Sequence, residues 1–443
     1  VSTSTASTFN SYSPSFNSIG VSEFNLDASG GHSRNNRLNL HNHSHSHHMK
    51  HDHDRNRKKM NLTNDKPMTL MSLGRALSSG FFDLGNPHEL SEAAEYFKKA
   101  ADLGNSDAMY HYAKMRSKGI GIEQDYSEAF EYFMKSREQS RLDRQNQNQH
   151  QQHQNQHQNS QFSSSPAAFI SSNFSAVSDD CGIKATRKAA KMLLEGIGTQ
   201  KDVKKASLLF KEAAEEGQDL YSMYTYASIL VKDETVKDKE ERRQNIQKAA
   251  QYFKLAAQNG IVDAAVEYGK ILENGYGGYE KNIDSAVNFY FIAAKAENPE
   301  ALYLIGHLYE TGIGLDKSAK DAKNYYLKAA DKGNQQAMLR IAHFYKKGKG
   351  GLQKSKQQAL LYYQKAADLG NVEAMMKYAS LRKKQGDPTT TNLNDALAYY
   401  EKAASLGSPK AKLKLLKLEK KMKTKVKKEM NKDGKPPPIP KKS

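Results

Sequence analysis

One aromatic and alanine motif recurs along this chain, and its period constrains the fold more than any other feature. Two aromatic residues are followed by two alanines, as in Tyr325-Tyr326 and Ala329-Ala330. The second alanine of successive copies stands at positions 214, 257, 294, 330, 367 and 404, so the period is 36 to 43 residues. Such a period is typical of solenoids, in which each short unit buries its apolar face against the next.

Each period contains two amphipathic helical segments, because apolar residues recur three and four positions apart. The first segment carries a small residue where we expect two helices to cross, and it usually ends in Gly-x-Gly, a pattern that favours a left-handed helix cap. A small residue lets the helix axes approach, and an aromatic side chain fills the space beside it. The predicted crossing residues are Gly74, Ala113, Ala190, Ala227, Gly269, Gly306, Ala342 and Ala379.

These patterns predict an all-α protein, an α/α superhelical solenoid of about eight helix pairs with disordered flanks. A further helix near residues 410–430, rich in leucine and lysine, is predicted to cap the C-terminal end. Its lysines would then face solvent, as the outer face of a terminal repeat requires.

The segment from Ala301 to Asn334 resembles the Sel1-like repeat, a tetratricopeptide-related unit that is also called HCP-like. The resemblance extends over residues 70–430 apart from one insertion. It implies a non-enzymatic scaffold or adaptor that binds other proteins. Because Cys181 is the single cysteine, the disulfide-stapled bacterial branch of the family is not expected. The resemblance also points to fungal members, which include regulators of chitin synthase and cell-cortex factors.

Low-complexity segments interrupt and flank the repeats. Residues 145–159 contain only Gln, Asn and His, a composition that predicts a flexible tract able to self-associate. We therefore expect a monomer or weak self-association through that tract. The predicted organisation is a disordered Ser/Asn/His-rich tail over 1–65, repeats over 66–139, a disordered Gln/Asn/His-rich insertion over 140–180, repeats over 181–421 and a Lys-rich tail over 422–443.

The net charge of +18 is unevenly distributed. Residues 410–443 contain 14 lysines and 3 acidic residues, so they supply +11 of that charge. This concentration at one end is unlike a nucleic-acid-binding surface, which is basic over a whole face. No run of about 18 apolar residues and no apolar leader are present, so a cytoplasmic protein is expected, with the cell cortex as the finer expectation.

No group of residues predicts catalysis. The Gly-x-Gly turns recur in several repeats without a preceding strand, which indicates structural turns and not phosphate loops. Cys181 has no neighbouring histidine in the sequence, and the His-rich tract over 41–53 is interpreted as a solvated tail. We expect neither an enzyme nor a cofactor or metal site.

The first helix of each pair is expected to line a concave groove, as in tetratricopeptide arrays. Tyrosine, lysine and histidine there would suit an extended peptide with acidic or aromatic character. The alternative is that these are ordinary surface or core-edge residues. The predicted groove residues are Tyr110, Lys114, Tyr224, Lys270, Tyr303, His307, His343 and Met376.

The C-terminal segment offers a second interaction motif. Pro437, Pro440 and Lys442 match a short SH3-type ligand, although a plain solvated end is the competing interpretation. Two alternative functions remain at this point. One is an adaptor in ER-associated degradation, which the family resemblance implies, and the other is a nucleic-acid or acidic-surface binder acting through the Lys-rich tail.

Overall fold

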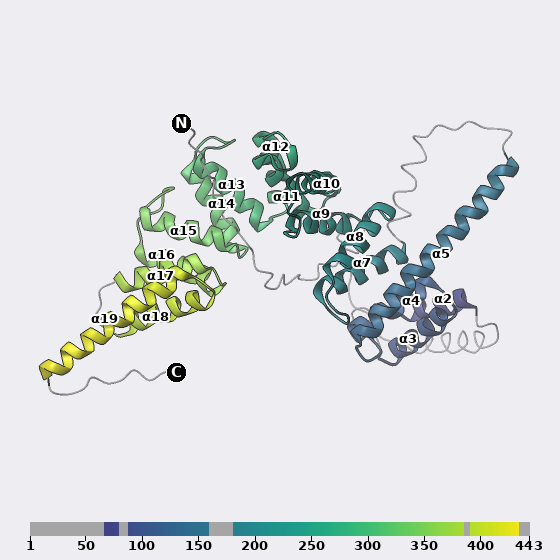
Figure 1. Cartoon of the computed structure of the whole chain (residues 1–443), viewed down its shortest axis with the longest axis horizontal. Helices are drawn as coiled ribbons and strands as arrows, with labels where there is room; N and C mark the ends of the chain where they lie inside the picture. Colours follow the sequence, from purple (N-terminus) through teal and green to yellow (C-terminus); the bar gives the residue numbers. More distant parts are fainter. Residues whose placement is uncertain (1–65, 79–86, 159–179, 385–389, 434–443) are drawn as a thin grey trace, which may run out of the picture. The chain divides into compact units, whose positions relative to one another are not determined.

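The computed structural model describes residues 66–78, 87–158, 180–384 and 390–433, and all regular structure in these ranges is helical. The predicted tail over 1–65 and the SH3-type motif at Pro437, Pro440 and Lys442 lie outside the described residues. The all-α prediction is therefore confirmed for the part of the chain that the structure describes (Figure 1).

Two kinds of helix alternate along the chain, and we call them A and B helices. The A helices are α2 (Pro67–Ser78), α4 (Ser106–Lys118), α7 (Cys181–Glu195), α9 (Leu220–Lys232), α11 (Val262–Asn274), α13 (Pro299–Thr311), α15 (Gln335–Lys347), α17 (Val372–Lys384) and α19 (Pro409–Asp433). The B helices are α3 (Pro87–Asp102), α5 (Tyr126–Gln158), α8 (Val203–Glu216), α10 (Lys239–Gln258), α12 (Ile283–Lys295), α14 (Ala319–Asp331), α16 (Lys356–Asp368) and α18 (Thr390–Ser405). A 3-10 turn, Tyr276–Gly278, follows α11.

Each A helix packs on the B helix that follows it, and each B helix packs on the next A helix (Figure 1). The described residues thus form eight helix pairs followed by α19, which packs on α18 as the predicted capping helix. This consecutive packing is a repeat solenoid, as predicted, because each unit completes its core only against its neighbour.

The small crossing residues lie where A and B helices touch. A Cβ atom added at Gly269 would lie 2.5 Å from Cε1 of Tyr290, and one at Gly306 would lie 2.8 Å from Cδ1 of Tyr326. Carbon atoms do not approach so closely without displacement, so glycine is required for this helix spacing. The predicted role of the small residues in close packing is confirmed at these positions.

The A helices end as the Gly-x-Gly pattern predicts. Gly312 has a left-handed φ of 80°, and its backbone N–H donates to the carbonyl of Leu308. Helix α9 differs because its sequence has no such glycine. It ends at Asp233, whose φ is −69°, and a charged connection leads to α10. The missing Gly-x-Gly of this repeat therefore changes the turn that follows α9 and not the packing of the helix.

An asparagine begins several A helices and also joins neighbouring repeats. The side chain of Asn298 accepts hydrogen bonds from the backbone N–H groups of Glu300 and Ala301, and its Nδ2 donates to Asp263 Oδ1 of the preceding A helix at 2.8 Å. Asn334 caps α15 and donates to the carbonyl of Pro299 at 3.2 Å. One side chain thus caps a helix and contacts the previous repeat.

A large aromatic residue of each B helix fills the core, and its type changes along the chain. The first four pairs use phenylalanine and the last four use tyrosine, all at most 3% exposed. Two of these tyrosines donate their hydroxyl to an acid of the A helix, Tyr290 to Glu273 at 2.7 Å and Tyr326 to Glu310 at 2.9 Å. The residues are Phe97, Phe133, Phe210 and Phe253, then Tyr290, Tyr326, Tyr363 and Tyr400.

The predicted disordered insertion over 140–180 differs from the structure in its first half. Helix α5 is 33 residues long and continues through the Gln/Asn/His tract to Gln158 (Figure 1). Low hydrophobicity indicates that a segment has no core of its own, but glutamine is a good helix former, so the helix of the repeat can extend into it. Residues 159–179 lie outside the described ranges. Helix α19, from Pro409 to Asp433, lies where the capping helix near residues 410–430 is predicted, and it continues past residue 422, where the Lys-rich tail is predicted to begin.

Candidate functional site

Side-chain contacts between successive A helices place these helices side by side. Arg187 of α7 binds Asp219 at the start of α9, with 2.8 Å between Nη1 and Oδ2. Lys270 of α11 binds Glu300 of α13 at 2.5 Å. The surface that the A helices form, here called the A-helix face, is where the sequence predicts a groove.

The residue after each buried crossing residue is half-exposed in every repeat from α4 to α17. These residues therefore lie at the same level of the A-helix face. They are Lys114, Lys191, Ser228, Lys270, His307, His343 and Ser380.

Among the other predicted groove residues, Tyr224, Tyr303 and Met376 are half-exposed, whereas Tyr110 is only 7% exposed. The ring of Tyr110 packs against Phe133, with 5.9 Å between centroids, so it belongs to the core. Their role in binding stays a prediction.

The α11–α13 section of the face is internally paired. Lys270 Nζ lies 2.9 Å from Glu267 Oε1 and 2.5 Å from Glu300 Oε1. Burial by itself lowers the pKa of a lysine, but these two carboxylates outweigh it and raise the pKa of Lys270. This lysine is therefore held as one member of an ion-pair network.

The next section, around α13 and α15, is aromatic and basic. The Tyr303 ring lies 5.7 Å from that of Tyr326 and 6.3 Å from that of His307. Burial, followed by nearby Lys347, lowers the pKa of His343, although Glu310 acts in the opposite direction. The lowered pKa keeps His343 neutral at neutral pH, and a neutral imidazole offers one hydrogen-bond donor and one acceptor to a bound peptide.

The α4–α7 section has the opposite character to the α11–α13 section. Lys188 is half-buried, and its pKa is lowered first by burial and then by the positive charges of Arg187, Lys191, Lys118 and Lys114. Among the described residues, Lys188 makes no ion pair or hydrogen bond.

His111 lies on the same face. Burial, followed by Arg75, Lys114 and Lys184, lowers its pKa to about 4. Lys188 and His111 stand two residues before their crossing residues, a position that the sequence interpretation did not consider. The 3.6-residue period of the helix would have predicted that this position lies on the same face.

Cys181, the first residue of α7, is buried. Burial, followed by Asp107, raises the pKa of its thiol to about 12. The thiol is therefore protonated at neutral pH, and a protonated thiol is a poor nucleophile.

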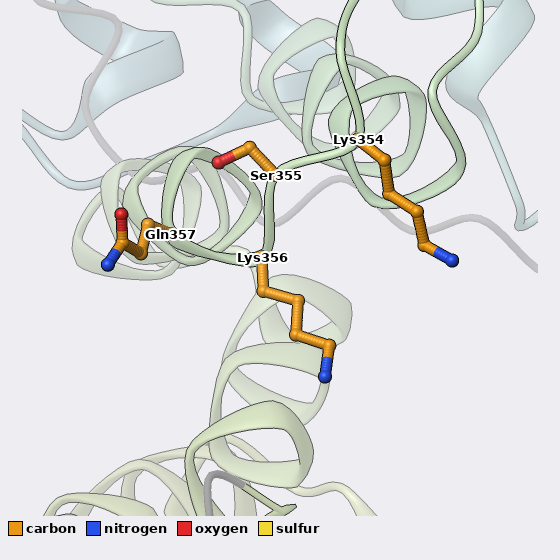
Figure 2. Close-up of a pocket in the computed structure, with 4 residues that line it drawn as sticks. All are labelled: Lys354, Ser355, Lys356 and Gln357. Carbon is orange, nitrogen blue, oxygen red and sulfur yellow. The ribbon is translucent and has the colours of Figure 1, made fainter.

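A shallow hollow of about 500 Å³ lies at the start of α16, lined by Lys354, Ser355, Lys356 and Gln357. Figure 2 shows that the four side chains point in different directions, and Ser355 caps α16. This hollow has no convergent set of groups such as an active site needs.

Within the described ranges, no three His, Cys, Asp or Glu residues come together as a metal site. A search of the same residues finds no helix with the length and apolarity needed to span a bilayer.

Comparisons with known proteins agree with this architecture. The Sel1 repeat model matches residues 73–105, 106–140, 183–218, 240–261, 262–298, 299–334, 335–371 and 372–408, more than half of the chain. The short match at 240–261 covers α10 but not α9, the A helix that does not end in Gly-x-Gly. No curated protein matches the chain.

A solved structure of a bacterial Sel1 repeat protein shares the fold at low sequence identity. A Sel1 repeat protein from Oxalobacter formigenes is 20% identical and has a TM-score of 0.55, with 83% of this chain and 90% of that chain covered. A protective antigen of uropathogenic Escherichia coli with an SLR fold is 20% identical and has a TM-score of 0.45, with 84% and 74% covered.

Proposed function

Because the chain belongs to the Sel1-repeat family, we propose that it is a non-enzymatic scaffold that binds a partner protein along the A-helix face. Sel1-repeat solenoids are typically protein-binding scaffolds and usually not catalytic. The observation that carries the proposal is the row of half-exposed polar residues at one level of successive A helices. A repeated surface of this kind suits an extended partner better than a small molecule, which needs an enclosed pocket.

The chemistry of the face favours a partner segment with acidic and aromatic side chains. Tyr303, His307 and His343 supply rings and hydrogen-bonding groups from two adjacent repeats. Aromatic residues at the centre of an interface contribute much of its binding energy. The half-exposed state of these residues leaves part of each ring available to a partner.

The finer role that we propose is regulation of cell-wall synthesis or of signalling at the cell cortex, in the cytoplasm. Its support is the resemblance of the repeats and low-complexity tails to fungal regulators, and so it rests on analogy. Imaging of a fluorescently tagged chain in its own cells tests this role. Enrichment beneath the plasma membrane is expected, and an even distribution through the cell would contradict it.

The binding proposal is tested with a double variant, His307→Glu with His343→Glu. Two negative charges on the face should remove an acidic partner, so we expect loss of the co-purifying proteins by quantitative mass spectrometry. The matched control is Lys328→Glu together with Lys365→Glu, on B helices α14 and α16. Thermal melting verifies that both variants fold. An unchanged partner set in the histidine variant would show that the face is not the binding surface.

A further inference from the structure

Helix α19 differs from the other A helices at the residue where a B helix crosses. The eight other A helices carry glycine or alanine there, and a step of 37 residues from Ala379 places Leu416 at the same position. In α13 the ring of Tyr326 packs directly on Gly306, the crossing residue. A leucine cannot receive a B helix at so short a distance. The outer side of α19 is therefore not built to continue the array.

That outer side exposes two leucines that are one turn apart. Leu413 is 55% exposed and Leu416 is 62% exposed, whereas Leu418 is buried in one core cluster with Tyr400 of α18. Helix α19 thus keeps its inner side in the core and presents apolar groups on its outer side. A terminal helix that only had to be solvated would carry polar residues there.

Lysines surround the two leucines. Lys417 and Lys420 stand four positions after Leu413 and Leu416, so they share the outer side of the helix, and both are exposed. We call these four residues the outer strip. Residues 409–420 contain five lysines and a single acid, Glu419. One carboxylate cannot balance five lysines, so this end of the array is strongly basic.

Helix α17 adds to the positive charge beside the outer strip. The Nζ of Lys414 in α19 donates to Ser380 Oγ of α17 at 3.3 Å. Burial, followed by three lysines of α17 and by Lys410, lowers the pKa of Lys414. Positive charges of the last two A helices therefore lie close together.

We propose that the outer strip binds the surface of a lipid bilayer that has anionic headgroups. Leu413 and Leu416 enter the boundary between the headgroups and the acyl chains, and the lysines extend to the phosphate and carboxylate groups around them. Charge complementarity is the argument for this occupant, since an anionic bilayer supplies many negative charges over an extended surface. The contact goes beyond the proposed scaffold, because it needs no partner protein.

Two other occupants fit the outer strip less well. A helix that docks in the groove of a protein presents apolar anchors at i, at i+3 or i+4, and at i+7. Counted from Leu413, the residues at i+4 and i+7 are Lys417 and Lys420, so the apolar strip is too short for a groove. A second copy of this chain would place the same lysines against these, and like charges repel.

The test uses the full chain in a vesicle flotation assay. One set of vesicles is phosphatidylcholine with about one third phosphatidylserine, and the other set is phosphatidylcholine alone. We expect binding to the anionic vesicles that is weaker at about 150 mM salt than at about 50 mM, and little binding to the neutral vesicles.

A leucine variant tests the apolar contact. Leu413→Ser with Leu416→Ser should weaken binding to the anionic vesicles by about tenfold. The matched control is Leu208→Ser with Ile292→Ser, which removes two exposed apolar side chains from B helices α8 and α12. It should change binding by less than about twofold, because these residues lie outside the strip. Thermal melting verifies that both variants fold.

A lysine variant tests the ionic contact. Lys417→Gln with Lys420→Gln should also weaken binding by about tenfold, because each lysine near an anionic surface contributes to the attraction. The matched control, Lys328→Gln with Lys365→Gln, removes the same charge from exposed positions of α14 and α16. It should change binding by less than about twofold, since salt screens distant charges.

Insertion is measured directly, because the chain contains no tryptophan. The indole of the Leu416→Trp variant should shift its emission to shorter wavelength on anionic vesicles, and lipids brominated in their acyl chains should quench it. Neither change is expected for Leu208→Trp. An unquenched indole in the Leu416→Trp variant would overturn the proposal.

Equal loss of binding in a double variant and in its control would also overturn the proposal. So would a loss in the lysine variant alone, since it would show adhesion by charge without insertion. Binding of single-stranded RNA that depends on Lys417 and Lys420, without binding to vesicles, would assign the strip to nucleic acid instead. The vesicle assay contains no partner protein, so its failure and the failure of the proposed A-helix face are distinguished.

Discussion

Helices α7 and α11 hold the same place in their repeats, but they present opposite electrostatic patterns. In α11 the residues two before and one after the crossing glycine are Glu267 and Lys270, which form an ion pair at 2.9 Å. In α7 the same two positions carry Lys188 and Lys191, which repel each other. The fold tolerates either pair, because both positions lie at the edge of the core and not within it.

This comparison separates what the repeat needs from what it leaves variable. The crossing residue and the aromatic residue of the B helix are buried in both repeats. In α11 the flanking residues Glu267 and Lys270 neutralise each other. In α7 the corresponding residues, Lys188 and Lys191, are both positively charged. A charge without a partner in the folded chain is a common mark of a binding surface, since function often costs stability.

The largest effect is expected in the core, where the two regions also differ. Tyr290→Ala should lower the free energy of unfolding by about 3–5 kcal/mol, because it leaves a cavity at the centre of a repeat. Tyr290→Phe should cost about 1–2 kcal/mol, because Glu273 then loses the hydroxyl that donates to it at 2.7 Å. Urea denaturation followed by circular dichroism measures both.

The reciprocal change is Phe210→Tyr in the α7–α8 pair. The residue that corresponds to Glu273 is Leu194 there, so the added hydroxyl has no acid to receive its proton. We expect destabilisation by about 1–3 kcal/mol. If Phe210→Tyr stabilised the chain, the two regions would not differ in the way described.

A second effect is a pH dependence that is specific to the α4–α7 section. His111 has a pKa of about 4 in the folded chain, below the ordinary value of 6.5. Above pH 6.5 the imidazole is neutral in both states and the contribution to stability is complete. As the pH falls from 6.5 to 4, the unfolded chain binds a proton that the folded chain does not, so up to about 3 kcal/mol of stability is lost.

His111→Asn should flatten the dependence of stability on pH between 6.5 and 4, measured by urea denaturation at several pH values. His88→Asn is the control, because the His88 side chain is 74% exposed. The same slope in His111→Asn and in the unaltered chain would mean that His111 is not the group responsible.

A smaller effect should follow from exchanging the two charge patterns. Lys188→Glu gives α7 the pairing of α11, and it should stabilise the chain by about 0.2–0.5 kcal/mol. Glu267→Lys places a like charge beside Lys270 and should destabilise it by about 1 kcal/mol. Thermal melting measures the exchange. If both variants were stabilised, or both destabilised, the described difference between α7 and α11 would be wrong.

The smallest effect is expected from removing the low-complexity tract. Arg144 of α5 contacts Asp180 at 2.9 Å, so the two ends of the segment between them are already close. Replacing residues 146–178 with a short Gly/Ser linker should change the free energy of unfolding by less than about 0.5 kcal/mol. A loss of cooperative melting would mean that the tract supports the repeats.

The sequence predicted the fold well because its signals are local and repeated. Gly306, the left-handed turn at Gly312 and the capping Asn334 each depend on a few neighbouring residues, and every copy reinforces the others. The extent of α5 was predicted poorly. A composition of Gln, Asn and His indicates solvation, and a solvated helix that extends from a packed one has the same composition.

The candidate site was predicted only in part. Positions such as Lys270 and His307 follow from the period, and the structure places them on the face as half-exposed residues. Whether a lysine there is neutralised depends on contacts between repeats, such as that of Lys270 with Glu300. No spacing rule gives that distance, because it is set by how one repeat docks on the next. For the same reason, Lys188 was recognised only from its surroundings.

The asparagine at the start of an A helix has a consequence for how the array comes apart. Asn298 begins α13 and also donates a hydrogen bond to Asp263 of α11. In the same way, Asn334 begins α15 and donates to the carbonyl of Pro299 in α13. Fraying of one helix end at such a residue also releases a contact with the unit before it. Opening should therefore advance in steps of a whole repeat, so protease cleavage should yield fragments that differ by about 37 residues.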